Sequence, residues 1–319
     1  MSLPLADRET TLPLARLVAR RHRALGERLG EPLARGARPG PFPGSRRGHG
    51  MDFDDLRPYV AGDDARHIDW RTSARRNAVH TRLYREEKDH PVTVVVDLRA
   101  TMFTGSSRLR AVCAGETAAD LLWRAASGGH RTGLVTLRER GLGFSRPAHG
   151  TRGALDGCRV LAEAFNEARR QAGPPASYPP PGGTDGTLSA PTLDRMLDEL
   201  LHASGRQGAS ILASGLDDPG DALQAALRRH ALARALAIVQ IRDPLERDSL
   251  PVGRYRYRGQ AGPTTVTLDR RSRQRVSDSL ALIQSRKQQL CDEAGVLLID
   301  ADTAPAEIIG RLRERGLLA

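Results

Sequence analysis

The sequence predicts an α/β fold in which helices cover both faces of a mostly parallel sheet. From Val92 onward, runs typical of strands alternate with segments whose apolar residues have helical spacing. This alternation is typical of parallel sheets built from strand–helix–strand units. The run "VTVVVD" at 92–97 has the continuous apolar character of a strand buried in such a sheet. At 319 residues the chain is long enough to bury a substantial core.

The region before this alternation has a different character. Pro13 stands at the start of a segment with helical spacing of its apolar residues, which predicts a basic amphipathic helix ending near Leu29. A connector rich in Gly, Pro and Arg follows, and the charged stretch after it contains an extended run, "AVHTRLYREE". We therefore divide the chain into a basic helical segment at 1–40, a charged module at 41–90 and an α/β domain at 91–319.

Each element of the α/β domain follows from its residue pattern. Apolar runs predict strands, amphipathic stretches predict helices, and "GPPASYPPPGGTDGT" predicts a loop. Asp217 or Asp218 could cap the helix that begins beside them. In chain order we expect a strand at 92–97, a helix at 108–127, two strands of a hairpin at 131–137 and 141–146, helices at 151–168 and 190–204, a strand at 208–214, a helix at 217–231, a strand at 234–241, a β-hairpin insertion at 250–268, a helix at 270–294, a strand at 295–300 and a helix at 304–316.

Composition excludes several classes of protein. Hydrophobic residues make up 39% and charged residues 27%, an ordinary soluble profile. No apolar run is long enough for a membrane helix, and the N-terminus lacks a signal-peptide core, so we expect a cytoplasmic protein. The wide spacing of Cys113, Cys158 and Cys291 excludes a thiolate zinc site and argues against a disulfide framework. We expect these cysteines to be small core residues.

The formal net charge is +11, and only Lys88 and Lys287 are lysines, so almost every basic residue is arginine. The charge is concentrated in residues 1–50 and in a second cluster at 66–85. A basic face of this kind could meet nucleic acid, an acidic protein or an anionic membrane. Aromatic residues are only 4%, which leaves few platforms for stacking bases.

Three groups of polar residues stand at predicted strand ends, where parallel sheets bind ligands. Asp97 ends the first buried strand, the Ser214–Gly215 pair ends another, and Asp300 ends the last. In "DLRAT", Asp97, Arg99 and Thr101 alternate along the chain, so their side chains could point together into one crevice.

This crevice has the beginnings of a metal site. The oxygens of Asp97 and Thr101, and of Thr184 in "GGT", are ligands that a hard divalent cation accepts, which makes these three the weak metal candidates. The guanidinium of Arg99 repels a dication and cannot deprotonate. We therefore expect Arg99 to occupy the place of a metal, paired with Asp97, and we expect no cofactor.

The stretch "DFDDLRPYVAGDDARHIDWRTSARR" is unusually rich in carboxylates. Together with His67 these groups could form a metal-dependent hydrolase site. Arginines interleave with them, however, which favours ion-paired scaffolding. The motifs of nucleophile-elbow hydrolases, zincins and P-loop ATPases are absent from the sequence.

The same stretch, continued through "NAVHTRLYREEKDHPVTVVVDLRATMFTG", resembles the hallmark of domain-of-unknown-function family 58. In that family it leads into a von Willebrand factor A-like domain, which has a Rossmann-like sheet. The resemblance extends over roughly residues 45–240. The matching residues are Asp52, Phe53, Asp55, Leu56, Arg57, Tyr59, Gly62, Asp63, Asp64, Arg66, Ile68, Asp69, Trp70, Ser73, Ala74 and Arg75.

The resemblance implies a metal-ion-dependent adhesion site built on a DxSxS loop, a Thr on a second loop and an Asp after a later strand. Asp97 matches the first Asp and Thr184 the second-loop Thr, whereas Arg99 replaces the first Ser and Thr101 the second. At the last position the expected Ser-Asp pair reads Ser214–Gly215. Arg99 and Gly215 therefore both disfavour Mg²⁺, and the resemblance implies a degenerate site.

The resemblance also implies a partner. Members of the family are often encoded beside MoxR-type AAA+ ATPases and are thought to act with them as adaptors in protein maturation or assembly. Many relatives carry membrane helices before this region, where this chain has the basic segment 1–40, so a soluble form is implied.

Our leading hypothesis is a non-enzymatic adaptor that binds a MoxR-type ATPase or its client. The crevice would hold a partner carboxylate, and the charged module would brace the domain or dock the partner. The alternatives are a nucleic-acid-binding protein that uses residues 1–50 and 66–85, and the metal-dependent hydrolase described above. The partner-binding candidates are Asp97, Arg99, Thr101, Thr184 and Ser214; those of the module are Asp52, Asp55, Arg57, Tyr59, Asp63, Asp64, Arg66, Asp69 and Trp70.

Overall fold

The computed structural model forms two compact units, which are described separately below. The first contains Met1–Arg38 and His90–Ala319, and the second contains Pro39–Asp89. The residues that the structure describes are 7–24, 29, 51–60, 63–86, 91–172, 191–204, 208–217, 219–248, 251–259, 262–302 and 305–318.

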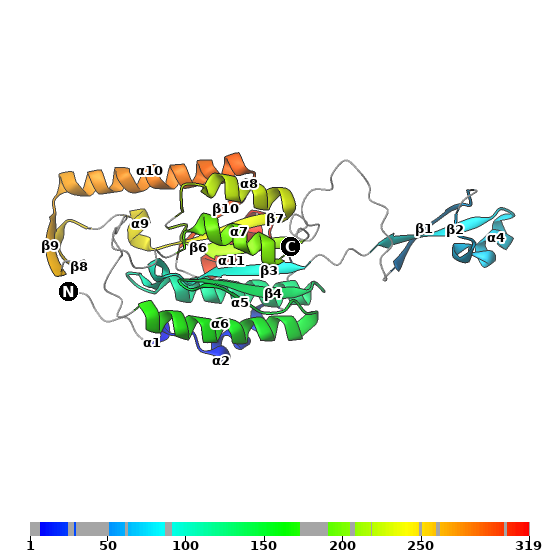
Figure 1. The fold of residues 1–319 in the computed structure, drawn as a ribbon, viewed down its shortest axis with the longest axis horizontal. Helices are drawn as coiled ribbons and strands as arrows, with labels where there is room; N and C mark the ends of the chain where they lie inside the picture. Colours follow the sequence, from blue (N-terminus) through cyan, green and yellow to red (C-terminus); the bar gives the residue numbers. More distant parts are fainter. Residues whose placement is uncertain are drawn as a thin grey trace. The chain divides into compact units, whose positions relative to one another are not determined.

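A six-stranded sheet forms the centre of the first unit (Figure 1). Its order is β10-β7-β6-β3-β4-β5, and only the edge pair β4–β5 is antiparallel. The order reverses between β3 and β6, which makes this the switch point where doubly wound sheets bind ligands. The strands are β3 (Val92–Asp97), β4 (Thr132–Arg138), β5 (Gly141–Phe144), β6 (Ala209–Ser214), β7 (Ala235–Arg242) and β10 (Leu297–Asp302).

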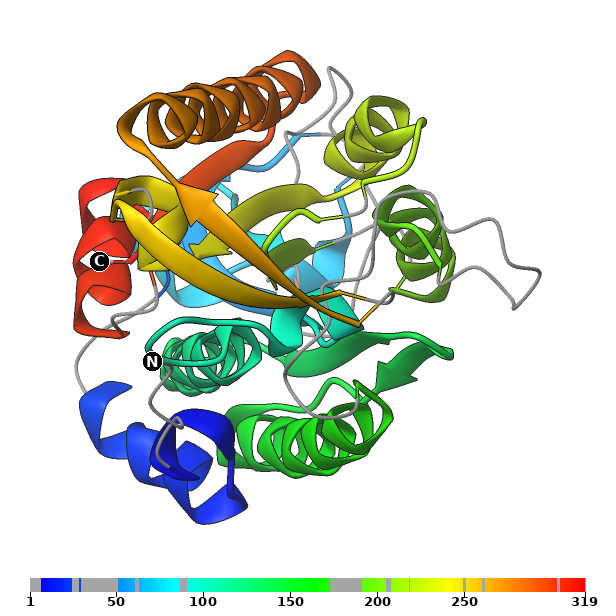
Figure 2. The same ribbon diagram turned by 90° about the vertical axis from the view of Figure 1, so that its left-hand side faces the viewer.

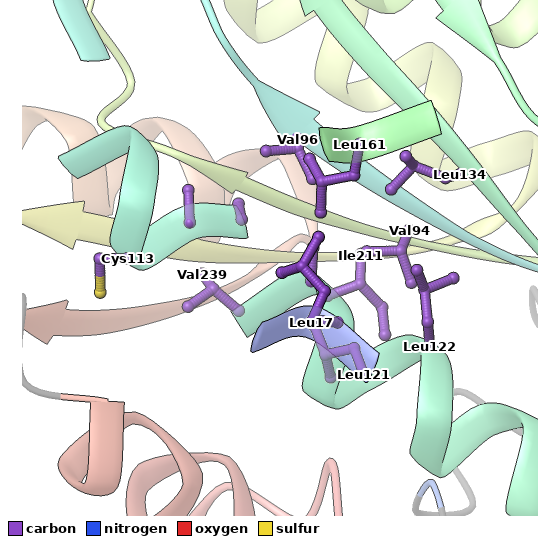
Figure 3. Packing of buried hydrophobic residues seen from close by; sticks show 14 of the residues in the cluster. Leu17, Val94, Val96, Cys113, Leu121, Leu122, Leu134, Leu161, Ile211 and Val239 are labelled. Atoms are coloured by element: carbon purple, nitrogen blue, oxygen red, sulfur yellow. The ribbon is translucent and has the colours of Figure 1, made fainter. Parts of the chain in front are cut away.

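Helices cover both faces of the sheet, as the strand–helix alternation predicts. On one face pack α5 (Arg110–Ser127), α6 (Gly150–Ala172) and α11 (Pro305–Glu314). On the other pack α7 (Leu193–Ser204), α8 (Leu223–Ala233) and α10 (Arg270–Ala294). Consecutive residues of β3 point to opposite faces, so Val94 and Val96 join the first core and Val95 joins the second. Figure 3 shows the first core from close by.

The N-terminal segment packs on the first core. It forms α1 (Asp7–Thr10), α2 (Leu14–Ala19) and the 3₁₀ helix η1 (Arg20–Ala24), which lie against α5 and α6. Leu17 is fully buried, and its carbonyl oxygen accepts a hydrogen bond from Trp123 Nε1 at 3.0 Å. The expected helix begins as predicted, directly after Pro13, but it continues as a 3₁₀ helix from Arg20; residues 25–28 of the expected helix lie outside the described residues.

Arginines of this segment also point inward. Arg16 and Arg20 pair with Glu116 of α5, and Arg20 also pairs with Asp120 one turn later. Glu116 is 1% exposed and also pairs with Arg108. We call Glu116, Asp120 and their arginine partners the N-terminal clamp. These arginines serve internal pairing, a role that the net charge of the segment does not reveal.

The second unit is a two-stranded antiparallel ribbon with short helices. The ribbon pairs β1 (Met51–Pro58) with β2 (His80–Glu86) and has a register shift between Phe53 and Asp55. Between the strands lie η2 (Ala65–His67) and α4 (Trp70–Arg76). The extended run at 78–87 predicts β2, whereas β1 and α4 are not expected from the sequence pattern.

A separate β-hairpin lies between β7 and α10 in the chain. After α9 (Pro244–Asp248), the strands β8 (Gly253–Gly259) and β9 (Gly262–Leu268) form the expected hairpin, which pairs only with itself and leads into α10 (Figures 1 and 2). The long α10 matches the predicted helix, with Asp269 as its N-cap and Gly295 as its left-handed C-cap.

One predicted cap is wrong. Helix α8 begins at Leu223, with Ala222 as N-cap, so Asp217 lies too far back to cap it. The backbone amide of Ala222 instead donates to Asp194 Oδ2 of the neighbouring helix α7 at 3.1 Å. Asp218 lies outside the described residues.

Two expectations from composition concern the described residues. Cys113, Cys158 and Cys291 are all buried, as expected for core residues, and burial raises the pKa of Cys158 to about 12. None of the helices in the described ranges is long and apolar enough to cross a membrane.

Candidate functional site

The candidate site lies at the switch point of the sheet. Asp97 is the last residue of β3, and Ser214 is the last residue of the neighbouring strand β6. Because these strands are parallel, their carboxyl ends meet at one edge, as the sequence predicts. After Asp97 the chain turns into the 3₁₀ helix η3 (Ala100–Phe103), with Arg99 as its N-cap residue.

Arg99 folds back over Asp97. Its Nε donates to Asp97 Oδ1 at 3.0 Å, and its Nη2 donates to Asp97 Oδ2 at 2.8 Å. The backbone amide of Arg99 also reaches Oδ1 at 3.1 Å, and Ser214 Oγ donates to Oδ2 at 2.7 Å. Both carboxylate oxygens therefore accept two hydrogen bonds each, which uses the acceptor capacity of the group.

This pairing decides the charge state of Asp97. Burial alone would raise the pKa of this fully buried carboxyl, but the charge and hydrogen bonds of Arg99, with that of Ser214, hold the pKa of Asp97 below its usual value. The aspartate is therefore ionised at neutral pH, and the bidentate geometry is the strong form of an arginine–carboxylate pair.

The same arginine connects the two loops of the crevice. Its Nη2 also donates to the carbonyl oxygen of Asp217 at 2.8 Å, in the loop after β6. In that loop Leu216 has φ +55°, a left-handed conformation that is uncommon for a non-glycine residue. Its amide donates to Ser214 Oγ at 3.0 Å, and its side chain is buried. The loop therefore holds an uncommon backbone conformation beside the ion pair, fixed by this hydrogen bond and by the buried side chain.

A second ring of charges surrounds this pair. Asp217 lies between Arg110 of α5, whose Nη2 is 2.9 Å from Oδ2, and Lys287 of α10, whose Nζ is 3.6 Å from Oδ1. Arg110 also donates to the carbonyl oxygen of Thr101 at 2.7 Å, and Lys287 donates to that of Gly215 at 2.8 Å. Burial lowers the pKa of Lys287, although Asp217 opposes the shift.

Sequence reasoning missed this ring. Arg110, Asp217 and Lys287 come from α5, the loop after β6 and α10, and nothing in the local pattern brings them together. The one available signal was that Lys287 is one of only two lysines in an arginine-rich chain.

The residues present do not fit a divalent cation. The guanidinium of Arg99 lies where a cation would bind Asp97, and both oxygens of Asp97 are already used. At Gly215 an added Cβ would lie 2.6 Å from Asp217 Oδ2 and 2.7 Å from Arg110 Nη1, so ionic side chains already fill the space where the resemblance implies a carboxylate. Thr184 lies outside the described residues.

The remaining crevice candidates are buried rather than open. Arg99 is 2% exposed and Asp97 is fully buried, so neither offers a free group to a partner in this arrangement. Thr101 lies within η3, buried, and its Oγ1 makes no hydrogen bond to any described residue. The backbone amide of Ala100 donates to Glu139 Oε1 at 2.7 Å, which ties the turn after β4 to the same loop. Asp300, which was expected at the end of the last strand, does not join the residues around Asp97. It pairs with Arg242 at 2.9 Å.

In the second unit the described carboxylates are used locally. Asp63 pairs with Arg57 at 2.7 Å, and Asp64 pairs with Arg66 at 2.9 Å. Asp69 caps α4 by accepting from the amide of Thr72 at 2.9 Å. The hydrogen bonds from Arg66 lower the pKa of Asp64 to about 2. The side chains of Asp52 and Asp55 lie outside what the structure describes.

Two aromatic residues of this unit face solvent. Trp70, the first residue of α4, is 68% exposed, and Tyr59 is 37% exposed. Arg71, Arg75 and Arg76 on the same helix are also exposed. Exposed tryptophan beside arginine is the composition of binding hot spots.

The structure is that of an α/β protein with a buried ion pair at the switch point of its sheet. The profile of the family described as "Protein of unknown function DUF58" matches residues 55–289, and the chain belongs to this family. The resemblance seen in the sequence is therefore confirmed at the level of the family. No curated protein matches the chain.

Several solved structures are similar to the chain, including the following three. The conserved hypothetical protein BatB from Bacteroides thetaiotaomicron is 9% identical, with a TM-score of 0.42, over 71% of this chain and 97% of that one. An aerotolerance-related membrane protein from Bacteroides fragilis NCTC 9343 is 11% identical, with a TM-score of 0.35, over 70% and 98%. An uncharacterized membrane spanning protein from Vibrio fischeri is 16% identical, with a TM-score of 0.22, over 71% and 97%.

Proposed function

We propose that this protein is a non-enzymatic adaptor with a von Willebrand factor A-like domain whose metal-ion-dependent adhesion site is degenerate. The sheet order, with its switch point between β3 and β6, supports this assignment of the domain. The partner that we propose is a MoxR-type AAA+ ATPase or its client, and this rests on the family resemblance.

The observation that carries the proposal is the bidentate pair of Arg99 and Asp97. A fixed internal cation takes the place of an exchangeable one and joins the loops after β3 and β6 through the carbonyl oxygen of Asp217. The crevice then acts as a rigid platform, and a partner binds to its rim rather than through a bridging ion. This modifies the simpler idea that Arg99 itself holds a partner carboxylate, because its Nε and Nη2 are already engaged.

The experiment is affinity capture from native lysate on immobilised full-length protein, with mass spectrometry of the retained proteins. Ser107→Trp adds bulk at an exposed position of the loop between η3 and α5, next to Ser106, whose hydroxyl donates to Asp243 just after the carboxyl end of β7, and it leaves the ion pair unaltered. Arg159→Trp, at an exposed position on α6, is the matched control. We expect an AAA+ ATPase to be retained by wild type and by the control, and lost with Ser107→Trp.

Retention of no AAA+ ATPase above background would contradict the proposed partner. Equal retention by both tryptophan variants would instead remove the crevice rim as the contact. The folded state of each variant is checked by its thermal unfolding midpoint.

A second candidate is nucleic-acid binding by the exposed Trp70 and the arginines of α4. Phosphate contacts release counterions, so the affinity for a single-stranded oligonucleotide should fall steeply with salt and fall further in Trp70→Ala. A flat salt response would exclude this function. Arg16 and Arg20, which the same hypothesis uses, are already paired with Glu116.

A further inference from the structure

Helix α10 is packed along only part of its length. In its C-terminal part Cys291 and Ala294 are buried in the second core. Ahead of them, Lys287 donates to the carbonyl oxygen of Gly215, and Gln284 exchanges hydrogen bonds with Gln240 of β7. One face of α10 is therefore turned toward the sheet.

The same face continues as an apolar stripe where this packing ends. Val276, Leu280 and Ile283 are spaced by four and three residues, and Ile283 is four residues before Lys287, so all lie on the side of α10 that meets the sheet further on. Yet Val276 is 38% exposed and Ile283 is 51% exposed. We call Val276, Leu280 and Ile283 the α10 stripe.

Arginine is concentrated in the sequence that leads into and contains the stripe. Residues 253–286 contain eight arginines and two aspartates. Four of these arginines lie within the first six residues of α10, and the first turn of the helix holds no acidic residue. Cations are unfavourable at the positive end of a helix dipole, so this end of α10 is electrostatically suited to an anionic partner. Arg273, exposed, lies three residues before Val276 and thus at the end of the stripe.

We propose that the α10 stripe, with Arg273 at its end, is the docking site for a segment of a partner protein that carries both acidic and apolar residues. This inference rests on the proposed binding function and specifies the chemistry of what is bound. The apolar residues of the segment cover the stripe, and its carboxylates lie against the arginines at the start of α10.

The orientation of the stripe favours a polypeptide over other anions. Lys287, on the same face of α10, donates to the carbonyl oxygen of Gly215 at the carboxyl edge of the sheet, so the stripe lies beside the domain rather than on its outermost side, which favours a narrow polypeptide segment over a planar bilayer. Figure 2 shows the β8–β9 hairpin in front of this edge. Nucleic acid would leave Val276, Leu280 and Ile283 without complementary contacts, since aliphatic side chains offer neither stacking planes nor hydrogen bonds to bases.

The test compares substitutions on opposite sides of the helix in full-length protein. The probe is a fluorescent synthetic peptide of alternating Glu and Leu, and binding is followed by anisotropy. Ile283→Ser and Arg273→Glu alter the stripe face. The controls Leu282→Ser, one residue before Ile283, and Arg275→Glu, two residues after Arg273, make comparable chemical changes on the opposite face, where Leu282 is 71% exposed. We expect the two stripe variants to weaken binding at least about tenfold and the two controls to change it less than about twofold.

Each other outcome overturns the assignment. Equal loss of peptide binding in a stripe variant and in its control would show that the peptide is held by diffuse electrostatic attraction and not by the stripe. Tighter binding of a single-stranded oligonucleotide or of phosphatidylglycerol vesicles than of the peptide would assign the α10 stripe and its arginines to nucleic acid or to a membrane. No binding of the peptide would remove the docking site but would leave capture of an AAA+ ATPase at the crevice rim intact, so the two proposals fail separately.

Discussion

Two of the buried aspartates of the first unit, Asp97 and Asp120, are paired with arginines in different ways. Arg99 and Ser214 hold the pKa of Asp97 below its usual value despite complete burial. Burial raises the pKa of Asp120, because desolvation outweighs the attraction of Arg20 and Arg124.

The comparison teaches that the number of arginines nearby matters less than how they are placed. Asp97 accepts four hydrogen bonds, three from Arg99 (one of them from its backbone amide) and one from the Ser214 hydroxyl. Asp120 shares Arg20 with Glu116, a like charge four residues away whose presence also raises the pKa of Asp120. The crevice pair therefore stabilises its loops, whereas the N-terminal clamp holds charges that are only partly compensated.

The largest expected effect is from Arg99→Ala. Removing the guanidinium leaves Asp97 buried and ionised without its partner, which costs about 3–5 kcal/mol of unfolding free energy. Chemical denaturation followed by circular dichroism measures the change. A loss below about 1 kcal/mol would mean that the pair is not the structural centre of the crevice.

A third buried group, His230, sharpens the comparison through its pH dependence. It is fully buried, and desolvation, with a smaller effect from Arg234, lowers the pKa of His230 to about 4. The folded-state pKa of His230 lies below the unfolded value of about 6.5. The contribution of neutral His230 to the unfolding free energy is therefore complete above that pH and is lost as the pH falls toward 4.

The loss amounts to about 3 kcal/mol across this window. Unfolding free energies of wild type and His230→Gln, measured in steps of pH, should converge as the pH falls. Parallel curves would show that His230 titrates normally. Asp97 should also lower the unfolding free energy as the pH falls, but only at a pH below the usual pKa of a carboxyl group.

Replacing the two aspartates by asparagine tests the comparison itself. We expect Asp120→Asn to cost about 1 kcal/mol, because Arg20 keeps Glu116 and Arg124 keeps backbone carbonyls as partners. Asp97→Asn should cost several times more, since it leaves Arg99 buried without a counter-charge. Equal losses in the two denaturation curves would contradict the difference drawn here.

The smallest effect is expected from Arg66→Ala in the second unit. Arg66 pairs with Asp64 but is 87% exposed, so solvent screens the pair. The thermal unfolding midpoint should not change measurably. A clear decrease in the midpoint would show that the Arg66–Asp64 pair is shielded from solvent.

Much of the fold could be predicted from the residue pattern. The strands β3, β6 and β7 and the helix α10 lie within one or two residues of the expected limits, because their apolar spacing and caps are local signals. Helix α8 was expected too early because Asp217 resembles a capping residue, whereas its carboxylate pairs with Arg110. Local patterns cannot reveal such a long-range competitor.

The candidate site could be predicted in part. Asp97, Arg99 and Ser214 were expected at one edge of the sheet, and the structure brings them together. The charges around them could not be foreseen, since Arg110 and Lys287 reach Asp217 from helices far away in the sequence. The N-terminal arginines were read as an outer basic face, but the partners of Arg16 and Arg20 lie about a hundred residues further along the chain.

The central claim is that Arg99 takes the place of a divalent cation at Asp97. Isothermal titration of Mn²⁺ into wild type and into Arg99→Ser with Gly215→Asp tests it most directly. The account predicts no binding heat for wild type and measurable binding by the double variant, in which a hydroxyl and a carboxylate replace the guanidinium and the glycine. Binding by wild type that is lost in Asp97→Asn would contradict it.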